Sequence, residues 1–230
     1  MPVNRTVIAI APIPPELEAH LAARFDLRHE RLGTGTSMPG IRVIVTTSMA
    51  GADEAVMDAF PDLALIACNG TGLDKIDLAA AAARGVTVQH TPDIVTEDTA
   101  DFAVGLMYAT SRRIAEADRF VRSGRWRTER MTPSRRLYSR TVGIVGLGNI
   151  GSAIARRAAG IGMTVLYTGP REKPDVPYAY RRDVVTLARE ADILVLSCPG
   201  GPATHHLVGA EVLEALGSEG ILINVSRGSV

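Results

Sequence analysis

The sequence predicts an α/β protein built from two doubly wound parallel sheets. Short apolar runs rich in β-branched residues alternate with helical segments along the chain, and such alternation produces parallel sheets with helices on both faces. A chain of 230 residues suggests one large domain or two modest ones, and the alternation occurs on both sides of a polar, basic stretch at 120–140. We therefore expect one domain over residues 1–101 and a second over residues 102–230.

The first domain is expected to contain a flavodoxin-like sheet. The helix after its first strand starts at Pro14 or Pro15, because proline is suited to the first turn of a helix. Pro61 and Gly85 mark the ends of the next two helices. The predicted strands cover residues 7–10, 25–27, 41–46, 63–68 and 86–88, and the helices after the third and fourth strands cover residues 53–60 and 76–83.

The second domain is expected to open with a long helix and an arm. The helix is predicted over residues 96–114, with Thr96 as its N-cap and acidic side chains in its first turn, where they suit the helix dipole. The stretch 120–140 that follows is irregular, contains the only tryptophan, Trp126, and is long for a plain linker. We therefore expect it to be an ordered arm.

Three glycines stand at the junction of a predicted strand, 141–145, and the helix that follows it. Gly146, Gly148 and Gly151 have the G-x-G-x-x-G spacing, which provides a tight turn, room for the backbone to approach a pyrophosphate, and close helix–strand packing. The start of the helix presents free N–H groups and a positive dipole end to the pyrophosphate. Because the spacing lies between a strand and a helix, it predicts a dinucleotide site.

The rest of the chain continues the alternation of strands and helices. Further strands are predicted at 163–167, 193–198 and 221–225, and helices at 183–190 and 211–216. The pattern gives about four strands, whereas a doubly wound dinucleotide domain usually has six. We therefore expect a Rossmann NAD(P)-binding domain that is truncated at its C-terminus.

The composition argues against a nucleic-acid-binding protein, a membrane protein and a secreted disulfide-rich protein. The formal net charge is zero, so the whole molecule has no attraction for nucleic acid or an anionic membrane. The sequence has no apolar run long enough to cross a bilayer and no signal-peptide pattern. Cys68 and Cys198 lie in predicted strands, which suits reduced thiols better than a disulfide framework. We expect a cytoplasmic protein that binds neither nucleic acid nor membrane.

Five stretches of the chain together resemble one known family. They are Asn69-Gly70-Thr71-Gly72 with Asp74, Ile76 and Asp77; Thr91-Pro92 with residues 96–102; Gly146 to Gly151; Cys198-Pro199 with Thr204; and residues 224–228. In this order they resemble the D-isomer-specific 2-hydroxyacid dehydrogenases, and the resemblance covers nearly the whole chain. Within that family the sequence is most similar to the glyoxylate and hydroxypyruvate reductases.

The resemblance implies an oxidoreductase that transfers a hydride between NAD(P)H and a small 2-oxo acid or D-2-hydroxy acid. It implies Arg227 as the catalytic residue; this arginine follows a strand at the edge where open α/β sheets place ligands, and its planar fork suits a 2-oxo acid. The expected substrate-binding residues are Asn69, Gly70, Thr71 and Gly72. The expected cofactor-binding residues are Thr99, Gly146, Leu147, Gly148, Asn149, Ile150, Gly151, Thr168, Gly169, Arg171, Cys198, Pro199, Thr204, Val225 and Ser226. No metal site is expected.

The acid–base pair of the family does not match any residues here. In the family a histidine, tuned by a glutamate, donates the proton, and both follow the arginine segment, whereas this sequence stops at Val230. We expect that the protein continues or that the fragment is inactive. None of the histidines present falls in the family's motif, and we expect a structural role for His20, His29, His90, His205 and His206.

The end of the second Rossmann strand predicts the choice of cofactor. NAD-specific sites place Asp or Glu there, about 20 residues after the glycines, to bind the ribose 2′-OH. In this chain the position falls at 168–170, which holds no carboxylate; Arg171 lies beside it, and Glu172 follows and is expected to point outward. An arginine can pair with a 2′-phosphate, and no carboxylate repels it. We expect NADP(H) to be preferred, with NAD(H) possible.

The expected partners follow from the same resemblance. The arm at 120–140, with Trp126, resembles the dimerisation segment of the family. An isologous two-fold homodimer that buries Trp126 is therefore expected. The other expected partner is the small-molecule 2-oxo acid substrate.

Two alternative functions stay open at this point. Relatives of the family act as transcriptional co-repressors, so the chain could be a non-catalytic NAD(P)-sensing or partner-binding module. Formate and phosphite dehydrogenases share the scaffold, and the residues present do not exclude them.

Overall fold

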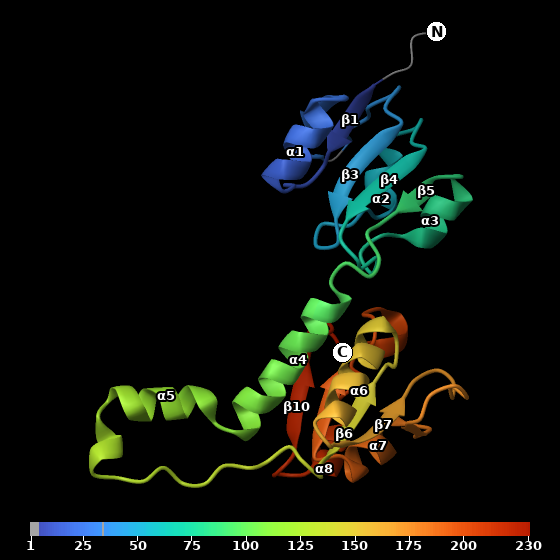
Figure 1. Cartoon of the computed structure of the whole chain (residues 1–230). Coiled ribbons are helices and arrows are strands. Elements are labelled where there is room, and N and C mark those ends of the chain that lie inside the picture. Colours follow the sequence, from blue (N-terminus) through green and yellow to red (C-terminus); the bar gives the residue numbers. More distant parts are fainter. Residues whose placement is uncertain (1–4, 34) are drawn as a thin grey trace. The chain divides into compact units, whose positions relative to one another are not determined.

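The computed structural model describes residues 5–33 and 35–230, and the chain forms two compact units, Met1–Ile94 and Val95–Val230 (Figure 1). Each unit contains one sheet of five strands, and every pairing between neighbouring strands is parallel. The predicted α/β class, with two parallel sheets, is confirmed.

The sheet of the first unit has the strand order β2-β1-β3-β4-β5. This order is the one found in flavodoxin-like sheets. Ile44 and Ile66 on the central strands are fully buried, because helices cover both faces there. The strands are β1 (Thr6–Ala9), β2 (Asp26–His29), β3 (Val43–Thr47), β4 (Leu65–Asn69) and β5 (Thr87–Gln89). The helices are α1 (Pro15–Ala22), α2 (Glu54–Asp58) and α3 (Leu78–Ala83).

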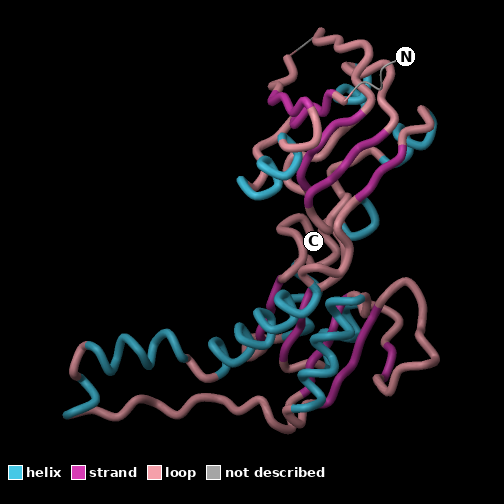
Figure 2. The backbone as a smooth tube through the Cα atoms, turned by 45° about the horizontal axis from the view of Figure 1, so that its top comes forward, coloured by secondary structure: helices cyan, strands magenta, loops and turns pink. Residues whose placement is uncertain are grey.

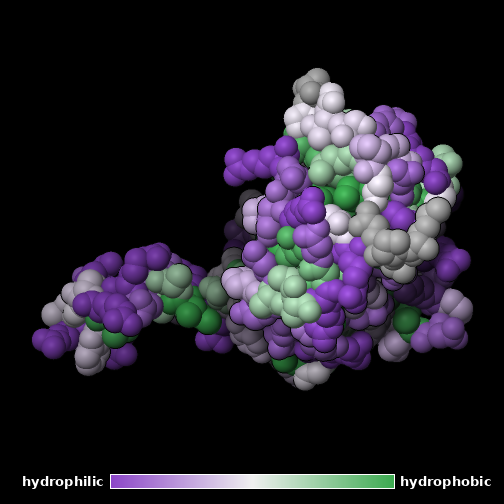
Figure 3. All heavy atoms as spheres, turned by 90° about the horizontal axis from the view of Figure 1, so that it is seen from above, coloured by the Kyte–Doolittle hydropathy of each residue, from purple (hydrophilic) through white to green (hydrophobic). Residues whose placement is uncertain are grey.

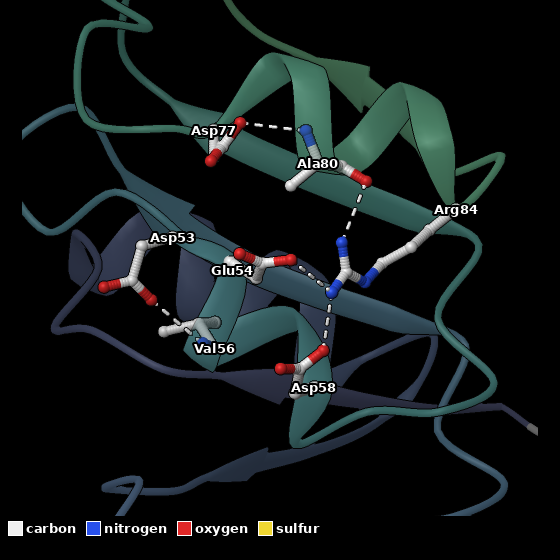
Figure 4. Close-up of polar contacts among 7 residues, drawn as sticks. All are labelled: Asp53, Glu54, Val56, Asp58, Asp77, Ala80 and Arg84. Atoms are coloured by element: carbon white, nitrogen blue, oxygen red, sulfur yellow. Dashed lines mark hydrogen bonds and ion pairs between the residues drawn. The ribbon is translucent and has the colours of Figure 1, made fainter.

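Aspartate caps and one arginine fix helices α2 and α3 (Figure 4). The Asp53 and Asp77 carboxylates each accept a hydrogen bond from a backbone N–H in the first turn of α2 and α3, at 2.9 and 2.8 Å. Arg84, which ends α3, forms ion pairs with Glu54 at 3.0 Å and Asp58 at 2.6 Å on α2. The two helices are therefore joined at their surfaces as well as through the core.

The sheet of the second unit has the strand order β10-β9-β6-β7-β8. Counted from β6, the strand before the glycines, this is the Rossmann order 5-4-1-2-3. The edge strand β8 was not predicted, because two residues are too few to show a period. The strands are β6 (Thr141–Val145), β7 (Thr164–Thr168), β8 (Ala179–Tyr180), β9 (Ile193–Leu196) and β10 (Ile221–Asn224).

Helices cover both faces of this sheet. Helices α4 and α6 pack on one face and α7 and α8 on the other, so that alternate residues of β6 and β9 enter different cores. Arg157 of α6 forms ion pairs with Glu97 at 2.7 Å and Asp101 at 2.6 Å on α4. The helical segments of the unit are α4 (Thr96–Ser111), α5 (Ile114–Arg122), α6 (Asn149–Gly160), α7 (Val184–Glu190), α8 (Ala210–Leu216), and the 3₁₀ turns η1 (Arg125–Arg127) and η2 (Pro202–Thr204).

Helix α4 differs from its prediction at both ends. The N-cap is Val95, whose side chain offers no acceptor, so Thr96 is the first helical residue and not the cap. The helix ends at Ser111, because Arg113 adopts a left-handed conformation with φ 52°. Helix α5 then starts in a new direction, followed by an extended return, and together they form the projecting arm (Figure 2).

The cap of α3 gives a test of local stability. Asp77→Ala removes the acceptor of the Ala80 N–H and should lower the free energy of unfolding by about 1 kcal/mol. Asp77→Asn keeps an acceptor and should stay close to wild type. Urea unfolding followed by circular dichroism compares the two variants, and an equal loss in both would contradict the cap as the cause.

Candidate functional site

The glycine turn between β6 and α6 has one open position and two closely packed positions. Gly146 has φ 90°, and a Cβ built on it would lie 2.7 Å from the Cys198 Cα atom. A Cβ on Gly151 would lie 2.1 Å from the Gly146 carbonyl oxygen, so this glycine lets the helix start directly against the turn. A Cβ on Gly148 would meet no atom within 4 Å. The turn is therefore open where a pyrophosphate would approach, and it fits a dinucleotide.

The start of α6 completes this cradle. Gly148 is the N-cap, and Asn149 and Ile150 form the first turn. A glycine cap brings no side-chain acceptor, so the positive end of this helix is available to an anion. The Leu147 side chain is buried in the core, so the expected contact of this residue with a cofactor can come only from its backbone.

The end of β7 lies beside the glycine turn. The Gly146 N–H donates to the Thr168 carbonyl at 2.9 Å, and Thr168 is buried. The Tyr180 hydroxyl donates to the Gly169 carbonyl at 3.0 Å. Arg171 is exposed on the segment that follows β7. In this fold the adenosine ribose is bound at the end of that strand, beside Arg171 in the sequence.

The loops after β9 and β10 are tied to the same edge of the sheet. The Ser226 hydroxyl donates to the Cys198 carbonyl. The Val225 N–H donates to the carbonyl of Leu196, the last residue of β9, at 3.1 Å. The Thr204 hydroxyl donates to the Pro199 carbonyl at 2.7 Å. Burial raises the pKa of the Cys198 thiol, which stays protonated near neutral pH. The predicted residues of these loops are thus brought together with the glycine turn.

Arg227 follows β10 in a turn built by an asparagine. The Asn224 side chain accepts from the Ser226 N–H at 2.8 Å and donates to the Arg227 carbonyl at 2.9 Å. The Val230 N–H donates to the same carbonyl at 3.2 Å. These contacts hold the backbone on both sides of a half-buried arginine, at the carboxyl end of the sheet.

The predicted substrate loop, Asn69 to Gly72, follows β4 in the first unit. Gly70 has φ 150°, and a Cβ on it would lie 2.0 Å from the Ser48 hydroxyl oxygen, so only glycine fits there. The Thr71 hydroxyl donates to the Thr91 carbonyl at 3.0 Å. The His90 Nδ1 atom lies 3.0 Å from the Thr71 carbonyl oxygen. His90 is expected to be structural, and nothing in the sequence indicates its contact with this loop.

Thr99, the remaining predicted cofactor residue, is half-buried on α4 in the second unit. Its N–H donates to the Val95 carbonyl at 2.9 Å, in the first turn of the helix. Among the described residues, no group of three His, Cys, Asp or Glu side chains is arranged to hold a metal ion. Within the same residues, no helix combines the length and the apolar character needed to cross a membrane.

Comparisons with known proteins agree with this geometry. Residues 104–230 match the family described as D-isomer specific 2-hydroxyacid dehydrogenase, NAD binding domain. The chain is 40% identical over 228 residues to glyoxylate/hydroxypyruvate reductase A of Arabidopsis thaliana, covering 96% of this chain and 73% of the relative. It is 40% identical over 199 residues to a glyoxylate reductase of Thermococcus kodakarensis, covering 83% of this chain and 60% of the relative.

Solved structures give the same result. An NADPH-dependent glyoxylate/hydroxypyruvate reductase of Sinorhizobium meliloti, in complex with NADP and malonate, has a TM-score of 0.88 and 35% identity, with 98% of this chain and 72% of that chain covered. A 2-hydroxyacid dehydrogenase of Ketogulonicigenium vulgare has a TM-score of 0.86 and 39% identity, with 97% and 73% covered. The chain therefore belongs to the D-isomer specific 2-hydroxyacid dehydrogenase family and is a nicotinamide-dependent oxidoreductase.

Proposed function

We propose that this protein reduces a small 2-oxo acid, glyoxylate or hydroxypyruvate, to the corresponding 2-hydroxy acid with NADPH. The observation that carries the proposal is the Asn224 turn, which holds Arg227 on the same sheet edge as the open glycine turn. The relatives named glyoxylate and hydroxypyruvate reductases support this substrate class. They also favour a reductase over a co-repressor-like module and over a formate or phosphite dehydrogenase.

Reduction of a 2-oxo acid needs a cation at the substrate, a proton donor and a fixed nicotinamide. The bound cofactor supplies the hydride. The Arg227 guanidinium donates to the substrate's carbonyl and carboxylate oxygens and stabilises the negative charge that develops on the carbonyl oxygen. The substrate-binding role of residues 69–72, in the first unit, stays a prediction; glycine-rich backbone N–H groups of this kind suit a carboxylate. In the family that the chain resembles, a histidine that follows the arginine segment donates the proton. None of the histidines within residues 1–230 lies in that motif, so none of them is assigned this role.

Arg227→Lys tests the catalytic assignment. Lysine keeps the charge but loses the planar fork, so kcat/KM should fall by roughly two or more orders of magnitude. Cofactor affinity should change little, because the guanidinium acts on the substrate. Steady-state kinetics with glyoxylate and hydroxypyruvate, together with NADPH titration, measure both quantities. An unchanged kcat/KM would remove Arg227 from the mechanism.

The preference for NADP(H) in this proposal depends on the segment after β7. No carboxylate ends that strand, and Arg171 stands exposed beside the position that binds the ribose 2′ substituent in Rossmann domains. The Sinorhizobium meliloti relative is named as NADPH-dependent. Arg171 would add a charge-assisted hydrogen bond to a 2′-phosphate, and a free 2′-hydroxyl gains far less from it.

Arg171→Ala tests this preference. We expect wild type to have the higher kcat/KM with NADPH, and the substitution to lower the NADPH/NADH ratio about tenfold or more, as loss of a charge-assisted contact predicts. Glu172→Gln, on the neighbouring residue, is a matched control that should not lower the ratio. Preference of wild type for NADH, or an unaltered ratio in Arg171→Ala, would refute the assignment.

Association through the arm is also part of the proposal. No residue of α5 is buried, and apolar side chains on it and on η1 are exposed, with Trp126 at 56%. Figure 3 shows hydrophobic residues among hydrophilic ones on this projecting segment. The arm keeps its shape through its own contacts, such as the Arg125 ion pair with Glu129 at 2.6 Å. A second copy of the chain, packed through a two-fold axis, would cover this surface.

Trp126→Ala tests the dimer. Removal of a large aromatic side chain from the interface should weaken association, because such residues carry much of the binding energy. Sedimentation velocity over a range of concentrations should show a dimer for wild type and a shift toward monomer for the variant. A wild-type protein that sediments as a monomer at micromolar concentration would contradict the proposed dimer.

We propose that the protein is cytoplasmic, because both of its cysteines are reduced thiols. Cys68 and Cys198 are both free and buried. Burial raises the pKa of the Cys68 thiol as it does that of Cys198, and both are therefore unreactive thiols. Free cysteines of this kind are typical of a reducing compartment.

A further inference from the structure

Two tyrosines clamp the segment that leaves β7. The Tyr180 hydroxyl donates to the carbonyl of Gly169, where the segment begins. The buried Tyr167 hydroxyl accepts the Lys173 N–H at 2.7 Å, at its other end. The two tyrosine rings lie 5.3 Å apart between centroids, so the clamp is itself packed. Residues 169–173 are therefore anchored at both ends.

This clamp directs the Lys173 side chain back across the edge of the sheet. The Lys173 ammonium donates to the Leu147 carbonyl at 2.5 Å, and Leu147 is the second residue of the glycine turn. The Gly146 N–H donates to the Thr168 carbonyl, so the ends of β6 and β7 are adjacent at this point. The ammonium thus contacts the turn that fits a pyrophosphate, and this turn is hydrogen-bonded to the end of β7, after which Rossmann domains bind the ribose 2′ substituent.

We propose that Lys173 is a second determinant of NADP(H) over NAD(H), acting with Arg171 on the 2′-phosphate. The inference rests on the proposed cofactor preference and deepens it. A lysine ammonium has three donors; the Leu147 carbonyl takes one and leaves two for phosphate oxygens. The positive charge is in place before the ligand arrives, so little side-chain entropy is lost on binding.

The two cations differ in how they are held. Arg171, at the middle of the segment, and Lys173, at its end, are both exposed, and Glu172 lies between them in the sequence. Lys173 is fixed at both its backbone and its ammonium. A Lys173 that only ties the segment to the glycine turn would affect the binding of NADPH and NADH equally. A Lys173 that binds the 2′-phosphate affects only NADPH, because NADH carries no such phosphate.

Equilibrium titration of the purified protein with NADPH and with NADH tests the inference by binding alone. Lys173→Met keeps an unbranched stem without the charge, and it should weaken NADPH binding about tenfold to a hundredfold while NADH binding stays unchanged. Lys173→Arg should retain most of the preference. Arg182→Met removes an exposed positive charge from the same unit as a control and should alter neither affinity.

Limited acetylation gives a readout that needs no variant. Residues 1–230 contain two lysines, Lys75 and Lys173. Lys75 lies in the first unit, where its ammonium donates to the Met49 carbonyl at 2.8 Å, and it serves as the internal reference. Mass spectrometry should show that NADP⁺ slows acetylation of Lys173 more than NAD⁺ does at equal saturation, with Lys75 unaffected.

Failure of this inference is distinguishable from failure of the proposed function. If wild type prefers NADPH while Lys173→Met lowers the affinity for both cofactors equally, or for neither, Lys173 has only a structural role or none. The proposed preference then still rests on Arg171. If wild type binds NADH as tightly as NADPH, or binds neither, the proposed preference is wrong and the role of Lys173 is overturned with it.

Discussion

The close contact between helix α6 and the glycine turn is the constraint on which the second unit depends. The helix can begin directly above β6 only because Gly151 has no side chain to strike the Gly146 carbonyl. Gly146 in turn packs against the backbone of Cys198, and its N–H binds the end of β7. One turn therefore sets the positions of three strand ends. The loops that carry the candidate site residues leave from those ends, so their positions follow from the same contact.

Much of the fold could be predicted because its elements carry strong local signals. The run at 141–145 is β-branched and apolar because its strand is buried on both faces. Strand β8 has no such signal; Tyr180 is placed by its contact with Tyr167, which lies on another strand. The break after α4 could not be predicted either, because Arg113 is in a left-handed conformation that arginine seldom adopts. Tertiary context decides both.

In the candidate site, too, some residues carry a signal in the sequence and others are placed only by tertiary contacts. The glycine turn could be predicted from the spacing of its glycines between a strand and a helix, and the role of Arg227, which stays a prediction, comes from the resemblance of residues 224–228 to the family's arginine segment. The tie between Lys173 and Leu147 could not, since it joins residues 26 positions apart and depends on the path of a loop. The contact of His90 with the Thr71 carbonyl has the same origin, because it joins the ends of two neighbouring strands. Side chains that bind backbone carbonyls across loops leave no periodic pattern to read.

The single tryptophan has a consequence for optical measurements on this protein. Trp126 is exposed on η1, in the arm, and the chain contains no other indole. Tryptophan emission therefore reports the surroundings of the arm and is blind to packing in either sheet. A red-shifted, easily quenched spectrum would describe a water-exposed arm in a fully native molecule. Unfolding of the cores must be followed through tyrosine absorbance or the backbone, since the indole responds only to what covers the arm, such as a second copy of the chain.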